Sequence, residues 1–284
     1  MRWLGNKESD NVDDRRGGGG KGLAMGGGIG TIIIALIYLF MGGDPSQVAN
    51  QLQNAIPSQQ NNTSVPRSAE EEKLASFTKV VLGLTESVWD SIYQSKGSQY
   101  EKPVLVMFTD QTQSGCGAAS AASGPFYCPG DKRVYIDLSF FDELAQKFQA
   151  PGEFAMAYVI AHEVGHHLQT LNGTSQKVHS ARSRVSEKEY NQLSVKLELQ
   201  ADFLAGVWAH HANKLKNILD PGDLEAALNA ANAIGDDRLQ KQSKGYVVPD
   251  AFTHGTSKQR MYWFKKGFDS GDLSQGNTFA GIEE

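Results

Sequence analysis

Residues 158–167 read Tyr-Val-Ile-Ala-His-Glu-Val-Gly-His-His, a His-Glu-x-x-His pattern inside an otherwise apolar run. On a helix, residues four apart lie one above the other, so His162 and His166 project from one face and can bind one zinc ion. Glu163 lies about 100° further round the helix, beside the metal rather than on it. Because zinc lowers the pKa of a bound water to about 7, Glu163 is placed to take a proton from it.

The neighbouring sequence favours a buried helix over residues 151–171. Pro151 and Glu153 suit a first helical turn, and Asn172 and Gly173 suit a C-terminal end. The residues between them are apolar over a broad surface, which is typical of a buried helix. An unpaired buried polar group costs about 1–3 kcal/mol, so the histidines and the glutamate need partners. A metal would satisfy them; ordinary hydrogen bonds in a chance match are the alternative.

A third ligand is predicted downstream, where residues 197–204 read Leu-Glu-Leu-Gln-Ala-Asp-Phe-Leu. Glu198 and Asp202 are four apart and therefore share one face of a helix. Catalytic zinc sites commonly use two histidines and one glutamate, and a ligand histidine usually passes its other N–H to a carboxylate. We therefore expect Glu198 to bind the metal and Asp202 to hold a ligand histidine. A solvated helix face is the ordinary interpretation of two acids, but the residues around these two are apolar.

These motifs are similar to those of the gluzincin zinc peptidases, which carry Glu-x-x-Ala-Asp after His-Glu-x-x-His. More closely, the chain resembles the bacterial putative neutral zinc metallopeptidase family, often called YpfJ-like. Three further segments carry this resemblance: Met-Arg-Trp at 1–3 with Ser-Asp-Asn-Val-Asp-Asp-Arg-Arg at 9–16, Tyr-Cys-Pro to Val-Tyr-Ile-Asp-Leu over 127–138, and His-Gly-Thr-Ser to Trp-Phe over 254–264. The resemblance implies a membrane-anchored zinc peptidase, with Asp202 orienting His162, but it does not imply the substrate. The peptidase activity itself leads us to expect a protein or peptide as the substrate.

The expected fold class is α+β and mainly helical: a zincin-like metallopeptidase domain with a small β-sheet, preceded by one transmembrane helix. Helical spacing covers residues 70–95, 139–148, 151–171, 175–219 with a break near Ser186, 224–242, and a last helix that Ser257 caps and that runs to Phe268. Strands are predicted at 103–109 and 134–138. By resemblance, the strand at 134–138 is the sheet edge that aligns the substrate backbone.

Residues 23–41 form a charge-free apolar run that is long enough to cross a bilayer as a helix. A cleaved signal peptide is the alternative, but the run is too long and no Ala-x-Ala site follows it. Gly26 and Gly30 form a Gly-x-x-x-Gly pattern, which suggests a homo-oligomer through this helix. Basic residues precede the run and none follows before Arg67. This bias predicts a single-pass protein of the bacterial inner membrane, with a cytoplasmic N-terminus and a periplasmic or otherwise extracytoplasmic catalytic domain.

The domain organisation follows from composition. Residues 1–22 are polar and Gly-rich and are expected to be a flexible cytoplasmic segment. Residues 42–69 are expected to be a disordered linker, residues 70–270 the metallopeptidase domain, and residues 271–284 a flexible tail. The formal net charge of −5 gives no reason to expect a nucleic-acid partner.

Cys116 and Cys128 are the two cysteines of the chain. On one loop outside the cytoplasm they are expected to form a disulfide, worth about 3 kcal/mol in the chain-entropy model. Their spacing fits no common cysteine zinc site.

The late stretch from Thr253 to Arg260 also invites a functional interpretation. It is similar to the Thr-His-Pro and later Arg of integral-membrane gluzincins, with Gly255 in place of Pro. This similarity suggests that His254, and with less support Arg260, donates to the oxyanion formed during peptide hydrolysis. A capping histidine is the alternative. The remaining histidines, at 167, 179, 210 and 211, are expected to be ordinary surface or core residues.

Together these features predict a zinc-dependent metalloendopeptidase. His162, His166 and Glu198 hold Zn²⁺, and Glu163 moves the protons of hydrolysis. Two other classes stay open: a zinc-binding but catalytically inactive membrane-anchored scaffold, and a metal-independent interaction module. The presence of Glu163 argues against the scaffold, because a structural site needs no base and is usually closed by four protein ligands.

Overall fold

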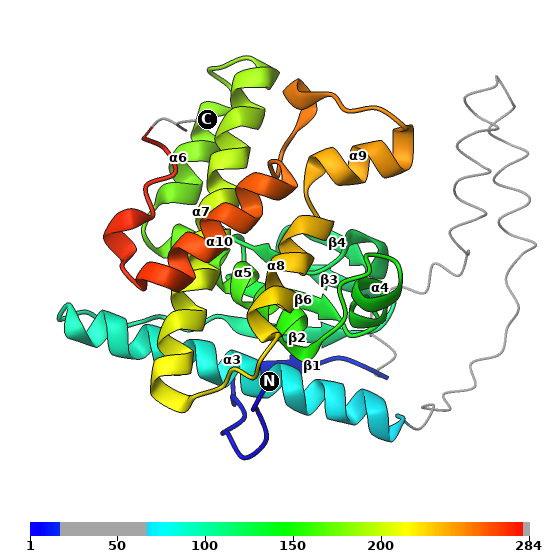
Figure 1. Cartoon of the computed structure of the whole chain (residues 1–284), viewed down its shortest axis with the longest axis vertical. Coiled ribbons are helices and arrows are strands. Elements are labelled where there is room, and N and C mark those ends of the chain that lie inside the picture. The colour runs from blue at the N-terminus through cyan, green and yellow to red at the C-terminus, as the bar shows by residue number, and fades with distance from the viewer. Residues whose placement is uncertain (18–66, 281–284) are drawn as a thin grey trace, which may run out of the picture. The chain divides into compact units, whose positions relative to one another are not determined.

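The computed structural model describes residues 1–17 and 67–280. Residues 1–16 belong to the same compact unit as the chain from Arg67 onward. Helices surround a small sheet in this unit (Figure 1), which confirms the mainly helical α+β class. The predicted transmembrane helix at 23–41 and nearly all of the linker at 42–69 lie outside the described residues. Within the two described ranges, none of the helices combines the length and the apolar character that crossing a membrane requires.

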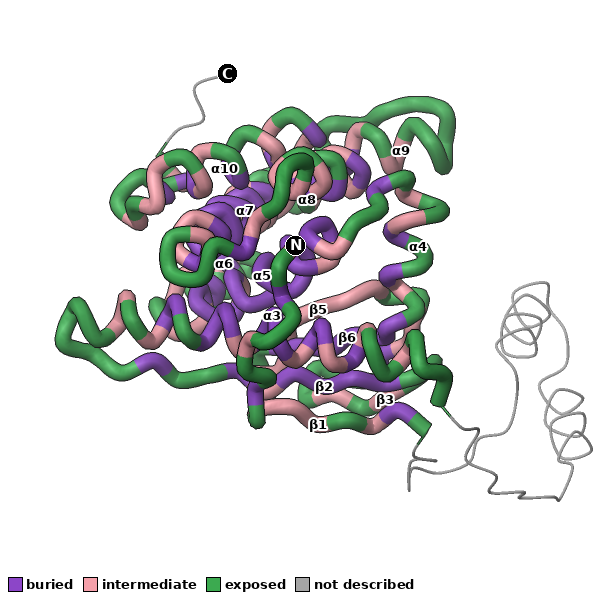
Figure 2. Tube along the Cα trace, turned by 60° about the horizontal axis from the view of Figure 1, so that its bottom comes forward, coloured by how far each residue is buried: buried purple, intermediate pink, exposed green. Residues whose placement is uncertain are grey.

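Three long helices carry most of the buried surface. They are α3 (Ala69–Ser95), α5 (Glu153–Leu171) and α7 (Glu187–Lys216). The side chain of Ser68 accepts a hydrogen bond from the backbone of Glu71 and begins α3, as the sequence predicts. A capping box of Ser186 and Glu189 begins α7 at the predicted break. Figure 2 shows that α5 is buried along most of its length, and that α7 is buried in its central part, continuously over 201–209.

Shorter helices surround these three. They are α4 (Phe140–Gln146), α6 (Thr174–Ala181), α8 (Asp223–Ala233), α9 (Asp236–Lys244) and α10 (Ser257–Ser270). The single helix predicted over 224–242 is therefore wrong, because the chain breaks at Gly235. A Cβ atom at Gly235 would lie 2.3 Å from the backbone nitrogen of Ser257, so the close approach of two segments ends α8 there. The cap of α10 is Thr256 rather than Ser257.

The sheet has four strands in the order β1-β2-β6-β5. They are β1 (Val12–Asp14), β2 (Val104–Phe108), β6 (Arg133–Asp137) and β5 (Phe126–Cys128). The first three are parallel, and β5 pairs antiparallel with β6. A separate hairpin joins β3 (Gln111–Ser114) to β4 (Gly117–Ser120).

The predicted strands at 103–109 and 134–138 are confirmed as β2 and β6, but the expectation that 134–138 is the sheet edge is wrong. The strand β6 lies between β2 and β5, so its backbone groups are paired on both sides. The edge that lies against α5 is β5. Sequence periodicity did not reveal β5 because it is only three residues long.

The N-terminal segment is folded, and the expectation of a flexible 1–22 segment is wrong for residues 1–16. Trp3 is 5% exposed, packs edge-on against Phe77 and donates a 2.9 Å hydrogen bond from Nε1 to Glu153. Arg16 is buried and pairs with Asp14 at 2.7 Å. The polar composition of the segment suggested disorder, but the core and the edge of β2 supply the partners that the segment lacks by itself.

The strand β1 is hydrogen-bonded to β2, so residues 1–16 and 67–280 form one folded unit. The predicted single-pass topology, with a cytoplasmic N-terminus and an extracytoplasmic catalytic domain, depends on residues outside the described ranges and stays a prediction.

Residues 271–280 are folded too, so the expectation of a flexible tail is wrong for them. Thr278 is 1% exposed and donates a 2.6 Å hydrogen bond to the carbonyl of Lys196 on α7. Gly276 packs so closely on α7 that a Cβ atom would lie 2.4 Å from the Phe203 ring. The structure does not describe residues 281–284.

The predicted disulfide between Cys116 and Cys128 is confirmed, with an S–S distance of 2.04 Å. Cys116 lies in the turn between β3 and β4, and Cys128 lies on β5. The bond therefore ties the β3–β4 hairpin to the edge strand.

We expect Trp3→Ala to lower the free energy of unfolding of the full chain by about 3 kcal/mol, because it removes a buried indole. Urea unfolding measures this change. The matched control is Leu4→Ala, which alters a neighbouring side chain that is 79% exposed and should have little effect. Equal stability of the two variants would mean that the N-terminal segment contributes nothing to the fold.

Candidate metal centre

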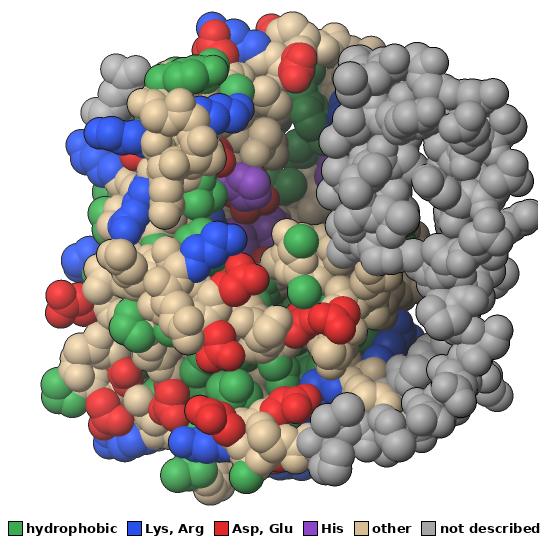
Figure 3. All heavy atoms as spheres, turned by 90° about the vertical axis from the view of Figure 1, so that its right-hand side faces the viewer, with side chains coloured by type: hydrophobic (Ala, Val, Ile, Leu, Met, Phe, Trp, Pro, Cys, Tyr) green, Lys and Arg blue, Asp and Glu red, His purple; other side chains and the backbone are tan. Residues whose placement is uncertain are grey.

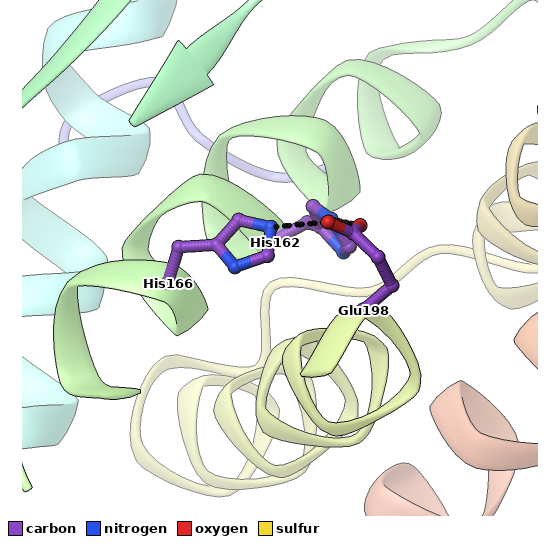
Figure 4. A group of neighbouring side chains, drawn as sticks. All are labelled: His162, His166 and Glu198. Atoms are coloured by element: carbon purple, nitrogen blue, oxygen red, sulfur yellow. Dashed lines mark hydrogen bonds and ion pairs between the residues drawn. The ribbon is translucent and has the colours of Figure 1, made fainter. Parts of the chain in front are cut away.

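Two helices bring the three predicted ligands together (Figure 4). His162 and His166 extend from α5, and Glu198 extends from α7. The Nε2 atom of His162 lies 3.1 Å from one carboxylate oxygen of Glu198, and the Nε2 atom of His166 lies 3.4 Å from the other. One ligand atom from each residue lies within 4.8 Å of the other two.

This geometry fits a zinc ion. Tetrahedral zinc with bonds of about 2.0–2.1 Å separates its ligand atoms by about 3.3 Å. The separations of 3.1 and 3.4 Å, each to a different oxygen of Glu198, are close to that value, and one ligand atom from each of the three residues lies within 4.8 Å of the other two. Two imidazole nitrogens and one carboxylate oxygen are also a donor set that zinc enzymes use, with a further position left for water.

Asp202 holds His162 from behind. Its Oδ1 atom accepts hydrogen bonds from Nδ1 of His162 at 2.8 Å and from the Tyr158 hydroxyl at 2.5 Å. Arg260 donates to both oxygens of Asp202, at 2.8 and 3.0 Å. Because Asp202 accepts from Nδ1 of His162, Nε2 is the nitrogen that faces Glu198 and that a metal can bind once it has lost its proton.

Burial and charge act against each other on these groups. Burial favours the neutral form of Asp202, but Arg260 and His162 outweigh it and hold the pKa of the carboxyl below its usual value. Burial also acts to lower the pKa of His162, but Asp202 and Glu198 raise it to about 10. A metal must therefore displace a proton from His162 in order to bind.

His166 has a different partner, which sequence reasoning missed. Its Nδ1 atom lies 2.9 Å from Oε1 of Gln169, a fully buried residue one turn further along α5. The spacing of three residues places the two side chains on one helix face, and this was the available signal.

Glu163 lies on the cavity wall beside the three ligands and is 8% exposed. Burial raises the pKa of its carboxyl, although His166 and His162 act in the opposite direction. A carboxyl with a raised pKa can both take and return a proton near neutral pH.

The ligands line a cavity of about 610 Å³. In Figure 3, histidine side chains are visible inside a hollow of the surface. The segment around β5 and helix α4 contributes Gly124, Phe126, Tyr127 and Phe140, and the segments before and within α9 contribute Ile234 and Leu239. The cavity is thus lined mainly by apolar residues around the polar metal-binding group.

His254 lies on the loop before α10 and lines the same cavity. Asp236, the first residue of α9, fixes this loop: one of its oxygens accepts the backbone N–H groups of Thr253, His254 and Gly255 at 2.7, 2.6 and 3.0 Å. Its other oxygen lies 3.2 Å from Nδ1 of His254. This hydrogen bond raises the pKa of His254 although burial acts to lower it. The break between α8 and α9 is therefore what brings Asp236 to the site.

Arg260 lines the cavity, but its guanidinium is engaged by Asp202 and by the carbonyl of Ile234. It acts on the site by holding Asp202, and the predicted oxyanion contact of Arg260 stays a prediction.

The other histidines are mostly structural. His167 is buried, accepts from the Tyr127 hydroxyl and donates to the carbonyl of Glu101. His210 and His211 donate to backbone carbonyls at the end of α10. His179 is exposed and contributes to the cavity lining.

Comparisons with known proteins agree with this geometry. Residues 1–279 match the family described as putative neutral zinc metallopeptidase. The chain is 50% identical over 285 residues to the uncharacterized protein YpfJ of Escherichia coli (strain K12), covering 98% of this chain and 99% of that one. It is 39% identical over 204 residues to an uncharacterized protein of Mycobacterium tuberculosis (strain H37Rv), covering 68% of each chain. No solved structure matches it.

Proposed function

Because the chain belongs to the putative neutral zinc metallopeptidase family, we propose that it is a zinc-dependent endopeptidase. The observation that carries this proposal is the position of Glu163 beside the group of His162, His166 and Glu198 in an open cavity. A structural zinc site is usually closed by four protein ligands. In the described part of the chain this group has three, which leaves room for a water and a substrate carbonyl.

Each residue of the site has a separate role in the proposed hydrolysis. When bound, zinc supplies a Lewis acid that acidifies a water and polarises the scissile carbonyl. Glu163 takes a proton from the attacking water and returns it to the leaving amine, for which its raised pKa suits it. His254 donates a hydrogen bond to the carbonyl oxygen as negative charge develops there. The hydrogen bond from His254 to Asp236 orients the imidazole and raises its pKa, which favours the charged, donating form.

The edge strand β5 suits an extended peptide. One side of β5 pairs with β6, and Phe126 and Tyr127 of this strand line the cavity. A peptide can add to the other side through main-chain hydrogen bonds, which require little of its side chains. We therefore assign the substrate class as proteins or peptides in extended form, bound along β5 rather than along β6.

We also place the folded unit, including residues 1–16, outside the cytoplasm. The support is the bond between Cys116 and Cys128, since disulfides persist in oxidising compartments. The N-terminal segment accompanies the catalytic domain because β1 pairs with β2.

Glu163→Gln tests the proposed chemistry in the full chain. It keeps the size of the side chain and removes the base, so we expect one bound zinc in both proteins and a peptidase rate lower by about 10²- to 10⁴-fold in the variant. Elemental analysis and cleavage of a peptide library measure these quantities.

The other outcomes of that experiment are informative. One zinc in both proteins with cleavage in neither would favour the inactive scaffold. An absence of zinc from both would overturn the assignment of the metal centre.

Asp236→Asn tests the role of His254 through pH. Asp236 raises the pKa of His254, so the wild-type imidazole stays charged to a higher pH than a free histidine. Without the carboxylate that pKa falls, and the alkaline decline of kcat should move to lower pH. His254→Ala should lower kcat by about 10²- to 10³-fold with zinc still bound. Superimposable pH profiles for wild type and Asp236→Asn would contradict this role.

Cysteine labelling tests the location. Leu4→Cys and Tyr246→Cys place thiols at positions that are 79% and 62% exposed, on the N-terminal segment and the catalytic domain. A membrane-impermeant maleimide should label both in intact cells. Labelling of Tyr246→Cys alone would contradict the shared side, and labelling of neither before permeabilisation would place the unit in the cytoplasm.

A further inference from the structure

We propose that Gln169 is the residue that positions His166 for metal binding, and that Gln200 and the C-terminal segment at 271–280 hold Gln169 in turn. This inference rests on the proposed zinc site of His162, His166 and Glu198. It adds a support on the His166 side that corresponds to Asp202 on the His162 side.

The amide of Gln169 has one orientation that its surroundings allow. Its Nε2 atom lies 2.7 Å from the carbonyl oxygen of Leu197 and 3.1 Å from Oε1 of Gln200. Both neighbours are acceptors, so both amide hydrogens are donated to them. A reversed amide would place three oxygens against one another in a fully buried position.

This orientation decides which nitrogen of His166 carries a proton. With Nε2 of Gln169 committed, its Oε1 atom is an acceptor and lies 2.9 Å from Nδ1 of His166. Nδ1 of His166 must therefore be the donor, which leaves the lone pair on Nε2. That Nε2 atom faces Glu198 at 3.4 Å, so the hydrogen bond both selects the tautomer and fixes the ring for a metal.

The neutral amide suits this position better than a carboxylate. The carbonyl of Leu197 and Oε1 of Gln200 would both repel a negative charge at 169. Asp202 can be charged because Arg260 donates to both its oxygens, whereas the amide of Gln169 has hydrogen bonds to His166, Leu197 and Gln200 and none to an arginine or lysine among the described residues. The two ligand histidines thus have different supports for a local electrostatic reason.

Gln200 extends the chain of hydrogen bonds to the end of the domain. It accepts from Gln169 through Oε1 and donates through Nε2 to the carbonyl of Gly276 at 3.1 Å. Thr278 anchors the same segment on the carbonyl of Lys196. The segment at 271–280 therefore contacts α7 directly behind Glu198 and fixes the partner of Gln169.

The test measures zinc affinity rather than activity. In the full chain we expect Gln169→Leu, which keeps the volume but removes both kinds of hydrogen bond, to raise the zinc dissociation constant by about 10- to 100-fold. Competition with a chromogenic chelator measures it. Gln192→Leu is the matched control, because Gln192 is exposed on the same helix α7 that carries Gln200 and should bind zinc as wild type does.

Two further measurements separate positioning from a general loss of structure. Gln200→Leu leaves Gln169 in contact with His166 but removes one acceptor of its amide, so it should weaken zinc binding in the same direction and by less. The visible spectrum of the Co²⁺-substituted protein should change in Gln169→Leu and stay unchanged in Gln192→Leu. A purely structural role would lower the stability of the zinc-free protein and leave that spectrum as it is.

These measurements distinguish a failure of the inference about Gln169 from a failure of the peptidase proposal. Wild-type zinc affinity and an unchanged cobalt spectrum in folded Gln169→Leu would overturn the inference while the peptidase proposal stands. If Gln169→Leu does not fold, wild-type affinity in Gln200→Leu would overturn it. A wild-type protein that binds no zinc would overturn both.

Discussion

The helices α5 and α7 approach each other so closely that a Cβ atom at Gly165 would lie 3.0 Å from the carbonyl oxygen of Ala201. Glycine at this position of the His-Glu-Val-Gly-His pattern allows the contact, because a Cβ atom there would require the backbone of Ala201 to move by a few tenths of an ångström. The same contact sets the distance between the histidines on one helix and Glu198 on the other. The distances of 3.1 and 3.4 Å between Glu198 and the two histidines therefore depend first on how closely the two helix backbones pack. The side-chain hydrogen bonds act within that spacing.

Such a contact buries charged and polar groups, and the surrounding residues supply their hydrogen-bond partners. Asp202 is fully buried and keeps its charge because Arg260 donates to both of its oxygens. Gln169 is equally buried and neutral, and every hydrogen-bonding atom of its amide has a partner. Buried polar networks of this kind are stable only when each member is satisfied, and they hold side chains in one orientation. Preorganised imidazoles are what a metal site requires.

Both ends of the described chain support the two central helices. Trp3 hydrogen-bonds to Glu153 at the start of α5, and Thr278 hydrogen-bonds to Lys196 on α7 near Glu198. The two segments are polar and short, and their composition resembles that of disordered tails. They are ordered because the core offers each a buried position, which composition does not report. The pairing of β1 with β2 also joins the N-terminal segment to the sheet of the catalytic domain.

The features that repeat along a helix could be predicted from the sequence. The pairs His162 and His166, and Glu198 and Asp202, were recognisable because helical geometry converts a spacing of four into a shared face. The start of α7 was recognisable because a capping box is local. The tertiary structure alone decided which segments meet: that β5 rather than β6 is the free edge beside α5, that the break at Gly235 brings Asp236 to His254, and that Gln169 has its partners on α7. These contacts join residues far apart in the chain, and no local periodicity encodes which distant partner satisfies a given backbone edge or buried amide.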